Sequence, residues 1–234
     1  GGTLNLDSTF TATSGIGTWN RTGGTVNVTG TINNIGSTFT LNNTTGSWNL
    51  LGGTISGGAV SIADGNTLVM TTTGGTLSNV AFGGDILLPA GTVVTLGGTT
   101  TFVAARLTGA STLRVAPGAT VNSPVFIEGA ATGTRTVQFG YGGSGTGTIG
   151  ASGSIRLMAA SGGGLSLSNS SNSTVTNNGL ISAEATGQTL TLGMSAFVNG
   201  GALAVSTGSL TLSPTSTSTN TGTISVSGGR SWLL

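Results

Sequence analysis

The chain has 234 residues and a formal net charge of +1, and it contains no cysteine and no histidine. Only 5% of the residues are charged, so there is no basic surface of the kind that binds nucleic acid. The missing cysteines exclude disulfides and thiolate metal sites. Glycine supplies 44 residues, as in flexible linkers, but 36% of the chain is hydrophobic and these residues recur periodically. Disordered chains are poor in such residues, so we expect a folded protein.

The predicted elements are short strands. Twelve times along the chain an apolar residue, a polar residue and a second apolar residue follow one another, which is the alternation of a strand with one buried and one exposed side. Helical spacing is nowhere sustained, so the fold class is expected to be all-β. In chain order the central polar residues of these phrases are Asn5, Asn27, Asn49, Ser61, Thr95, Arg114, Gln138, Arg156, Ser166, Thr191, Thr211 and Ser225.

The chain also contains an internal repeat. Residues 8–25 and 37–54 align without gaps, and the phrase Gly-Gly-Thr begins at Gly1, Gly23, Gly52, Gly74 and Gly97. The step from Gly23 to Gly52 exceeds the others by about the length of a strand and a turn, and we interpret residues 29–35 as an inserted strand or an enlarged corner. Periods of this length are typical of solenoids, propellers and other repeat arrays.

Strands this short bury their apolar sides most simply when the chain coils and each turn pairs with the next. We therefore predict a parallel β-helix (β-solenoid) of about ten turns of roughly 22 residues, forming a rod on the order of 50 Å long. Residues 1–234 are expected to form one such segment. A sandwich or propeller is the alternative, but only Asp64-Gly65, Asn178-Gly179 and Asn199-Gly200 supply the expected hairpin turns.

The two ends of the chain fit together in sequence. Ser231, Trp232, Leu233 and Leu234 followed by Gly1, Gly2, Thr3 and Leu4 spell SWLLGGTL, close to SWNLLGGTI at residues 47–55. We expect the last turn of one segment to continue into the first turn of the next, within a longer array or a head-to-tail stack. Whether that junction is covalent is left open.

Short-strand repeats rich in Gly, Thr, Ser and Asn, with Gly-Gly-Thr corners, resemble the β-solenoid shafts of bacterial surface proteins, such as autotransporter passengers and filamentous-haemagglutinin-like strand-repeat proteins. The resemblance implies an extracellular or cell-surface element that is elongated, structural or adhesive, and it supplies no catalytic residues. We expect a non-enzymatic shaft or fibre segment with itself as partner, no cofactor and no membrane insertion. The alternatives are a glycan-binding adhesin, a polysaccharide-active enzyme and an ice-binding protein.

Few residues could form a ligand-binding site. Arg114, Arg135 and Arg156 are evenly spaced in the sequence, which would suit an arginine column. Only Arg114 and Arg156 lie at phrase centres, however, and the phrase between them is centred on Gln138. We therefore predict one outward column of Arg114, Gln138 and Arg156 that could contact a glycan.

Two acidic residues are candidates for a second site. Asp64 and Asp85 are separated by close to one predicted turn, and they would be the acid pair of an enzyme or a calcium site. The nearby phrases Ala63-Asp64-Gly65 and Pro89-Ala90-Gly91 imply a longer local step, which would take the two acids out of register.

Threonine arrays and tryptophans are candidates for further binding sites. Alternating threonines such as Thr9, Thr11 and Thr13 could bind ice, but they do not recur at one fixed place in every turn. Trp19 and Trp48 hold equivalent repeat positions, which favours aromatic stacking between turns over sugar binding.

Overall fold

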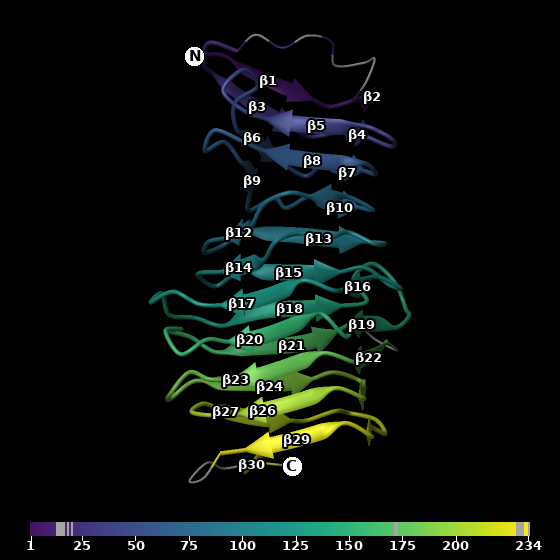
Figure 1. Ribbon diagram of the computed structural model, residues 1–234, viewed down its shortest axis with the longest axis vertical. Helices are drawn as coiled ribbons and strands as arrows, with labels where there is room; N and C mark the ends of the chain where they lie inside the picture. Colours follow the sequence, from purple (N-terminus) through teal and green to yellow (C-terminus); the bar gives the residue numbers. More distant parts are fainter. Residues whose placement is uncertain (13–16, 18, 20, 171–172, 228–231, 234) are drawn as a thin grey trace.

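The computed structural model is a rod of stacked turns without a helix in its described part (Figure 1). The structure describes residues 1–12, 17, 19, 21–170, 173–227 and 232–233. All strand pairs among these residues are parallel, and the turns contribute strands to three faces of the rod. The all-β fold and the β-solenoid of about ten turns of about 22 residues are therefore confirmed.

We name the faces by their strands. Face one consists of β1 (Thr3–Leu6), β3 (Thr25–Val28), β6 (Trp48–Leu50), β9 (Leu68–Met70), β12 (Ile86–Leu88), β14 (Ala105–Leu107), β17 (Pro124–Ile127), β20 (Ser154–Leu157), β23 (Leu180–Ala183), β26 (Ala202–Val205) and β29 (Thr223–Val226). Its hydrogen bonding is interrupted between β9 and β12.

Face two is one eleven-stranded sheet along the whole rod. Its strands are β2 (Thr9–Thr11), β4 (Thr31–Asn33), β7 (Thr54–Ser56), β10 (Thr76–Ser78), β13 (Val93–Gly97), β15 (Thr112–Val115), β18 (Arg135–Phe139), β21 (Leu165–Asn169), β24 (Thr189–Gly193), β27 (Ser209–Leu212) and β30 (Trp232–Leu233).

Face three holds two shorter sheets. Its strands are β5 (Thr38–Leu41), β8 (Ala59–Ile62), β11 (Ala81–Phe82), β16 (Thr120–Val121), β19 (Gly147–Ile149), β22 (Thr174–Asn177), β25 (Ala196–Asn199) and β28 (Thr219–Asn220).

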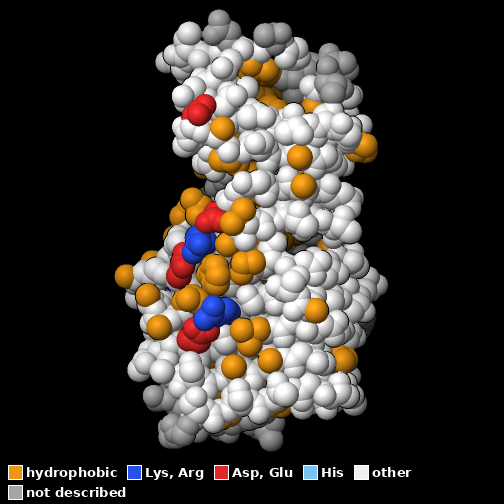
Figure 2. Space-filling model, viewed as in Figure 1, with side chains coloured by type: hydrophobic (Ala, Val, Ile, Leu, Met, Phe, Trp, Pro, Cys, Tyr) orange, Lys and Arg blue, Asp and Glu red, His pale blue; other side chains and the backbone are white. Residues whose placement is uncertain are grey.

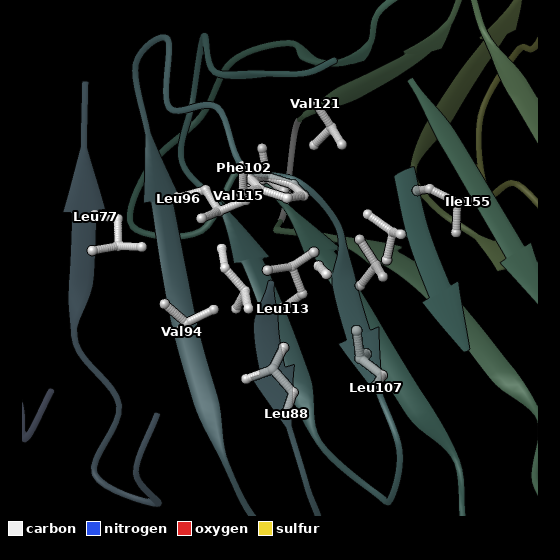
Figure 3. Packing of buried hydrophobic residues seen from close by; sticks show 14 of the residues in the cluster. Leu77, Leu88, Val94, Leu96, Phe102, Leu107, Leu113, Val115, Val121 and Ile155 are labelled. Carbon is white, nitrogen blue, oxygen red and sulfur yellow. The ribbon is translucent and has the colours of Figure 1, made fainter. Parts of the chain in front are cut away.

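The predicted alternation determines which side chains point into the core. All twelve sequence phrases fall within strands, and Figure 3 shows side chains from the three faces meeting inside the rod, among them Leu88 from face one, Leu113 from face two and Val121 from face three. Leu113 is fully buried between Val94 and Val137 of the neighbouring turns. Apolar side chains of one turn stack on apolar side chains of the next, and this close packing of the interior stabilises the short strands.

Glycines occupy the corner between faces three and one, where successive turns approach closely. A Cβ atom on Gly179 would lie 2.1 Å from the carbonyl oxygen of Gly153, and one on Gly201 would lie 2.2 Å from that of Gly179. No side chain fits at these distances. Residues without a side chain at this corner therefore let the turns stack.

Asparagine side chains form ladders between turns at both ends of the rod. On face one, Asn27 donates to Asn5 (2.8 Å) and Asn49 donates to Asn27 (2.9 Å). On face three, Asn177 donates to Asn199 (2.7 Å), which donates to Asn220 (2.6 Å). Such amide ladders repeat the spacing of the strands and reinforce parallel, in-register stacking.

The interpretation of residues 29–35 as an insertion is wrong. They contain β4, an ordinary member of face two that pairs with β2 and β7, and the step from Thr9 to its partner Thr31 is one ordinary turn. The long step from Gly23 to Gly52 arises because Gly-Gly-Thr marks different corners, leading into β3 on face one but into β7 on face two. The repeated phrase therefore does not mark one repeated position.

The two ends of the chain also differ in position from the internal phrase. In residues 47–55 the tryptophan strand β6 lies on face one and Gly-Gly-Thr leads into face two, whereas β30, with Trp232 and Leu233, lies on face two and β1 lies on face one. Leu234 lies outside the described residues. The joined ends thus resemble residues 47–55 in sequence, but their strands lie on different faces of the rod from the strands of that internal phrase.

Candidate functional site

The predicted column of Arg114, Gln138 and Arg156 is split between two faces. Arg114 on β15 pairs directly with Gln138 on β18, but Gln138 pairs next with Ser168. Arg156 lies on β20 of face one, between Phe126 and Ser182. The turn from Gln138 to Ser168 is longer than the predicted period, so the spacing of phrases in the sequence did not reveal which face each one joins.

Arg114 and Gln138 form a cluster with Tyr141 on face two. The guanidinium carbon of Arg114 lies 4.0 Å from the centroid of the Tyr141 ring, a cation–π contact. The Tyr141 backbone N–H donates to the carbonyl oxygen of Val115 (3.1 Å), which fixes the ring beside the end of β15. Gly140, with φ of 67°, makes the preceding turn that leaves the strand. Sequence reasoning missed Tyr141 because its contact depends on this turn.

Charged side chains gather in a second cluster, a stripe on face one that Figure 2 shows along one side of the rod. Arg106 donates from Nε to Asp85 (2.6 Å) and from Nη1 to Glu128 (3.1 Å), and its guanidinium lies 5.1 Å from the Phe126 ring centroid. Farther along the same stripe, Arg156 binds Glu184 through Nε (2.7 Å) and Nη2 (2.9 Å). We call this group of ion pairs the charge ladder.

A sequence signal for the charge ladder existed. Asp85 and Arg106 are 21 positions apart and Arg106 and Glu128 are 22 apart, each one turn of the predicted solenoid, with opposite charges in succession. Arg156 and Glu184 are 28 apart, because the turn between β20 and β23 carries longer connections. Only the contacts of Arg106 could have been found from the predicted period.

Hydrogen bonds set the pKa values along the charge ladder. The bonds from Arg156 and then from the Ser182 hydroxyl hold the pKa of Glu184 below its usual range, although burial opposes the shift. The hydrogen bond to Glu184 raises the pKa of Arg156. The hydrogen bonds to Asp85 and, second, to Glu128 raise the pKa of Arg106. Arg106, Arg156 and Glu184 therefore stay charged at neutral pH.

The depressed pKa of Glu184 predicts a loss of stability in acid. Its contribution is fully present above the unfolded-state pKa of about 4.3 and is lost as the pH falls through the lower folded value. Because the Arg156 and Glu184 side chains are 34% and 21% exposed, we expect a contribution of about 0.5–1 kcal/mol. Urea denaturation between pH 3 and 7 should show a shallower acid decline for Glu184→Gln than for the wild type. The exposed Asp7→Asn is the control, and an identical decline in both variants would contradict the assignment.

Arg135, midway in the sequence between Arg114 and Arg156, has a different role. It is fully buried, and its guanidinium donates to the carbonyl oxygens of Gly133 (2.9 Å), Glu128 (3.1 Å), Thr108 (3.2 Å) and Gly129 (3.3 Å). Burial lowers the pKa of Arg135. This arginine links the corner before β18 to the preceding turn, and it is unavailable to a ligand.

Asp64 and Asp85, the candidate acid pair, bind different partners. Asp64 accepts a hydrogen bond from the backbone N–H of Asn43 (3.2 Å), on the preceding turn, whereas Asp85 binds Arg106, on the following turn. The longer local step is also wrong, since Ala59 pairs with Ala81 at the ordinary length of a turn. In the described part of the chain no group of three His, Cys, Asp or Glu side chains could hold a metal ion.

Threonines share one fixed place on face two only in the first five of its eleven strands, so the expectation that they do not recur at one place in every turn is confirmed. Arg114 and Gln138 end this column, which is therefore shorter than the rod. Thr13 of the predicted array lies outside the described residues. The in-register members are Thr9, Thr31, Thr54, Thr76 and Thr95.

The tryptophans stack as predicted. The ring centroids of Trp19 and Trp48 lie 4.7 Å apart, and Phe39 lies 4.5 Å from Trp48, which is fully buried. Two hollows of about 370 and 350 Å³ border Trp19, and none of their described lining residues is Asp, Glu or His. The aromatic cluster therefore packs the first turns together.

The fold and these clusters define the class of the protein as a β-solenoid repeat protein with polar groups on flat outer faces. The chain matches no protein-family model, no curated protein and no solved structure. The described residues include no helix that could cross a membrane. The function therefore has to be argued from the surfaces described above.

Proposed function

We propose that this chain is a structural segment of an extracellular or cell-surface shaft or fibre that assembles end to end, without catalysis. One observation carries the proposal: the inward-facing ladders are left open at both ends of the rod. Leu4 pairs with the buried Val26 yet is 45% exposed, and Val226 pairs with the buried Val205 yet is 37% exposed. Apolar side chains in such positions are covered when a further turn is added.

The end turns also present backbone groups that can pair. The Thr25 N–H donates to Gly2 and the Thr29 N–H donates to Leu6, so alternate residues of β1 face β3 and the N–H of Thr3 faces the open edge. The partner proposed for this edge is β29 on face one of a second copy. A stack of this kind would continue the parallel register of the rod.

The expected result for the purified chain is a set of rods that lengthen with concentration in multiples of about 50 Å, the height of roughly ten turns. Electron micrographs and scattering over a concentration series measure this. Thr3→Pro removes only the outward N–H and should yield single rods, whereas Thr3→Ala should assemble like the wild type. Single rods at every concentration in all three proteins would overturn the proposal.

A further inference from the structure

Arg114 differs from the other described arginines in having no hydrogen-bond acceptor for its guanidinium. Arg106 and Arg156 bind carboxylates, and Arg21 and Arg135 bind backbone carbonyl oxygens. Arg114 makes no hydrogen bond or ion pair within the described residues, and its contact is the ring of Tyr141. A partly exposed cation on a flat face is thus left with unused hydrogen-bond donors.

The surroundings of Arg114 are neutral and rich in hydroxyl groups. Along its own column Thr95 precedes it, with Gln138 next and Ser168 after that. In the adjacent outward column, Thr112 pairs with Thr136. Side chains of these two columns stand roughly 7 Å apart along each strand and about 4.8 Å apart between strands, so several hydroxyl groups lie within reach of a ligand on Arg114.

The centroid of the Tyr141 ring lies 4.0 Å from the guanidinium carbon of Arg114, and no described group accepts a hydrogen bond from its terminal N–H groups. A planar guanidinium binds a planar carboxylate through two parallel hydrogen bonds, and the neighbouring Gln138 amide adds a neutral donor. A single cation is too little for nucleic acid, whose binding depends on many phosphate contacts. Threonine and serine hydroxyls suit the hydroxyl groups of a sugar chain.

We propose that Arg114, Gln138 and Tyr141 bind the carboxylate of an acidic polysaccharide laid along face two. The charge ladder on face one is excluded as the site for this ligand, because each of its cations is already neutralised by a carboxylate. The site does not depend on end-to-end assembly, since all three residues lie within two adjacent turns.

The experiment measures retention and affinity on immobilised polygalacturonate, with dextran as the neutral control, and uses the single rods of the Thr3→Pro background. Binding by the parent protein should fall with added salt, and Arg114→Gln should weaken it by at least about tenfold. Arg156→Gln removes the same charge on face one and should change binding less than twofold. Thermal unfolding of each variant shows whether it is folded.

Two further variants separate the contributions within the site. Arg114→Lys keeps the charge but loses the fork, and Tyr141→Leu removes the stacking surface, so both should bind more weakly than the parent and more tightly than Arg114→Gln. Equal binding by the Arg114→Gln and Arg156→Gln proteins, or equal binding of dextran and polygalacturonate, would overturn the proposal. Tighter binding of dextran sulfate than of polygalacturonate would overturn the assignment to a carboxylate.

Discussion

Replacing Arg135 by alanine is expected to lower the free energy of unfolding by on the order of 3–5 kcal/mol. The guanidinium is fully buried and donates to four carbonyl oxygens, three of the corner before β18 and one of the preceding turn. Hydrogen bonds from a charged donor are worth about 1.5–3 kcal/mol each, and they are not additive. The carbonyl groups left behind in the alanine variant would be buried without a partner, which costs further free energy.

Denaturation by urea, followed by far-ultraviolet circular dichroism, measures this change. Arg135→Lys should fall between the wild type and Arg135→Ala, because a compact ammonium with three donors cannot reach all of the carbonyl oxygens that the guanidinium binds. Arg156→Gln, in a half-exposed ion pair, serves as the comparison and should cost about 1 kcal/mol or less. An Arg135→Ala protein as stable as Arg156→Gln would show that the buried hydrogen bonds contribute little.

Replacing Leu113 by alanine is expected to cost about 2–5 kcal/mol. Leu113 is fully buried at the middle of the rod, between Val94 and Val137 of the adjacent turns. The close packing of the neighbouring ladders prevents the cavity from collapsing, so both the lost burial and the cavity contribute.

The matched control for Leu113 is its neighbour on the same strand. Thr112→Ala alters an outward side chain and should change the free energy of unfolding by about 0.5 kcal/mol or less. Both variants are compared by urea denaturation under identical conditions. If the two substitutions cost the same, the assignment of Leu113 to the interior is wrong.

The sequence predicted the aromatic contact but not the roles of the arginines. The contact between the Trp19 and Trp48 rings was predicted from their matching places in the repeated phrase, and it is confirmed, although the strand of Trp48 pairs with β3 and not with the segment that holds Trp19. By contrast, the even spacing of Arg114, Arg135 and Arg156 suggested an arginine column, and the structure gives them three roles: an outward cation on face two, a buried tie between turns and a partner of Glu184 on face one. Equal spacing does not place residues on one face when the turns differ in length.

The pattern of apolar and polar residues was sufficient to predict the fold class and the direction of each side chain within its strand. Alternation has a period of two, so whether Leu113 faces inward and Arg114 outward is a local property that the pattern carries. The tertiary structure decided which strands are neighbours. On face two the turn from Thr76 to Thr95 is shorter than the average turn, and the turn from Gln138 to Ser168 is much longer. Corners absorb these differences at little cost. Pairing between neighbouring turns, which no local pattern encodes, therefore brings Arg114, Gln138 and Tyr141 together.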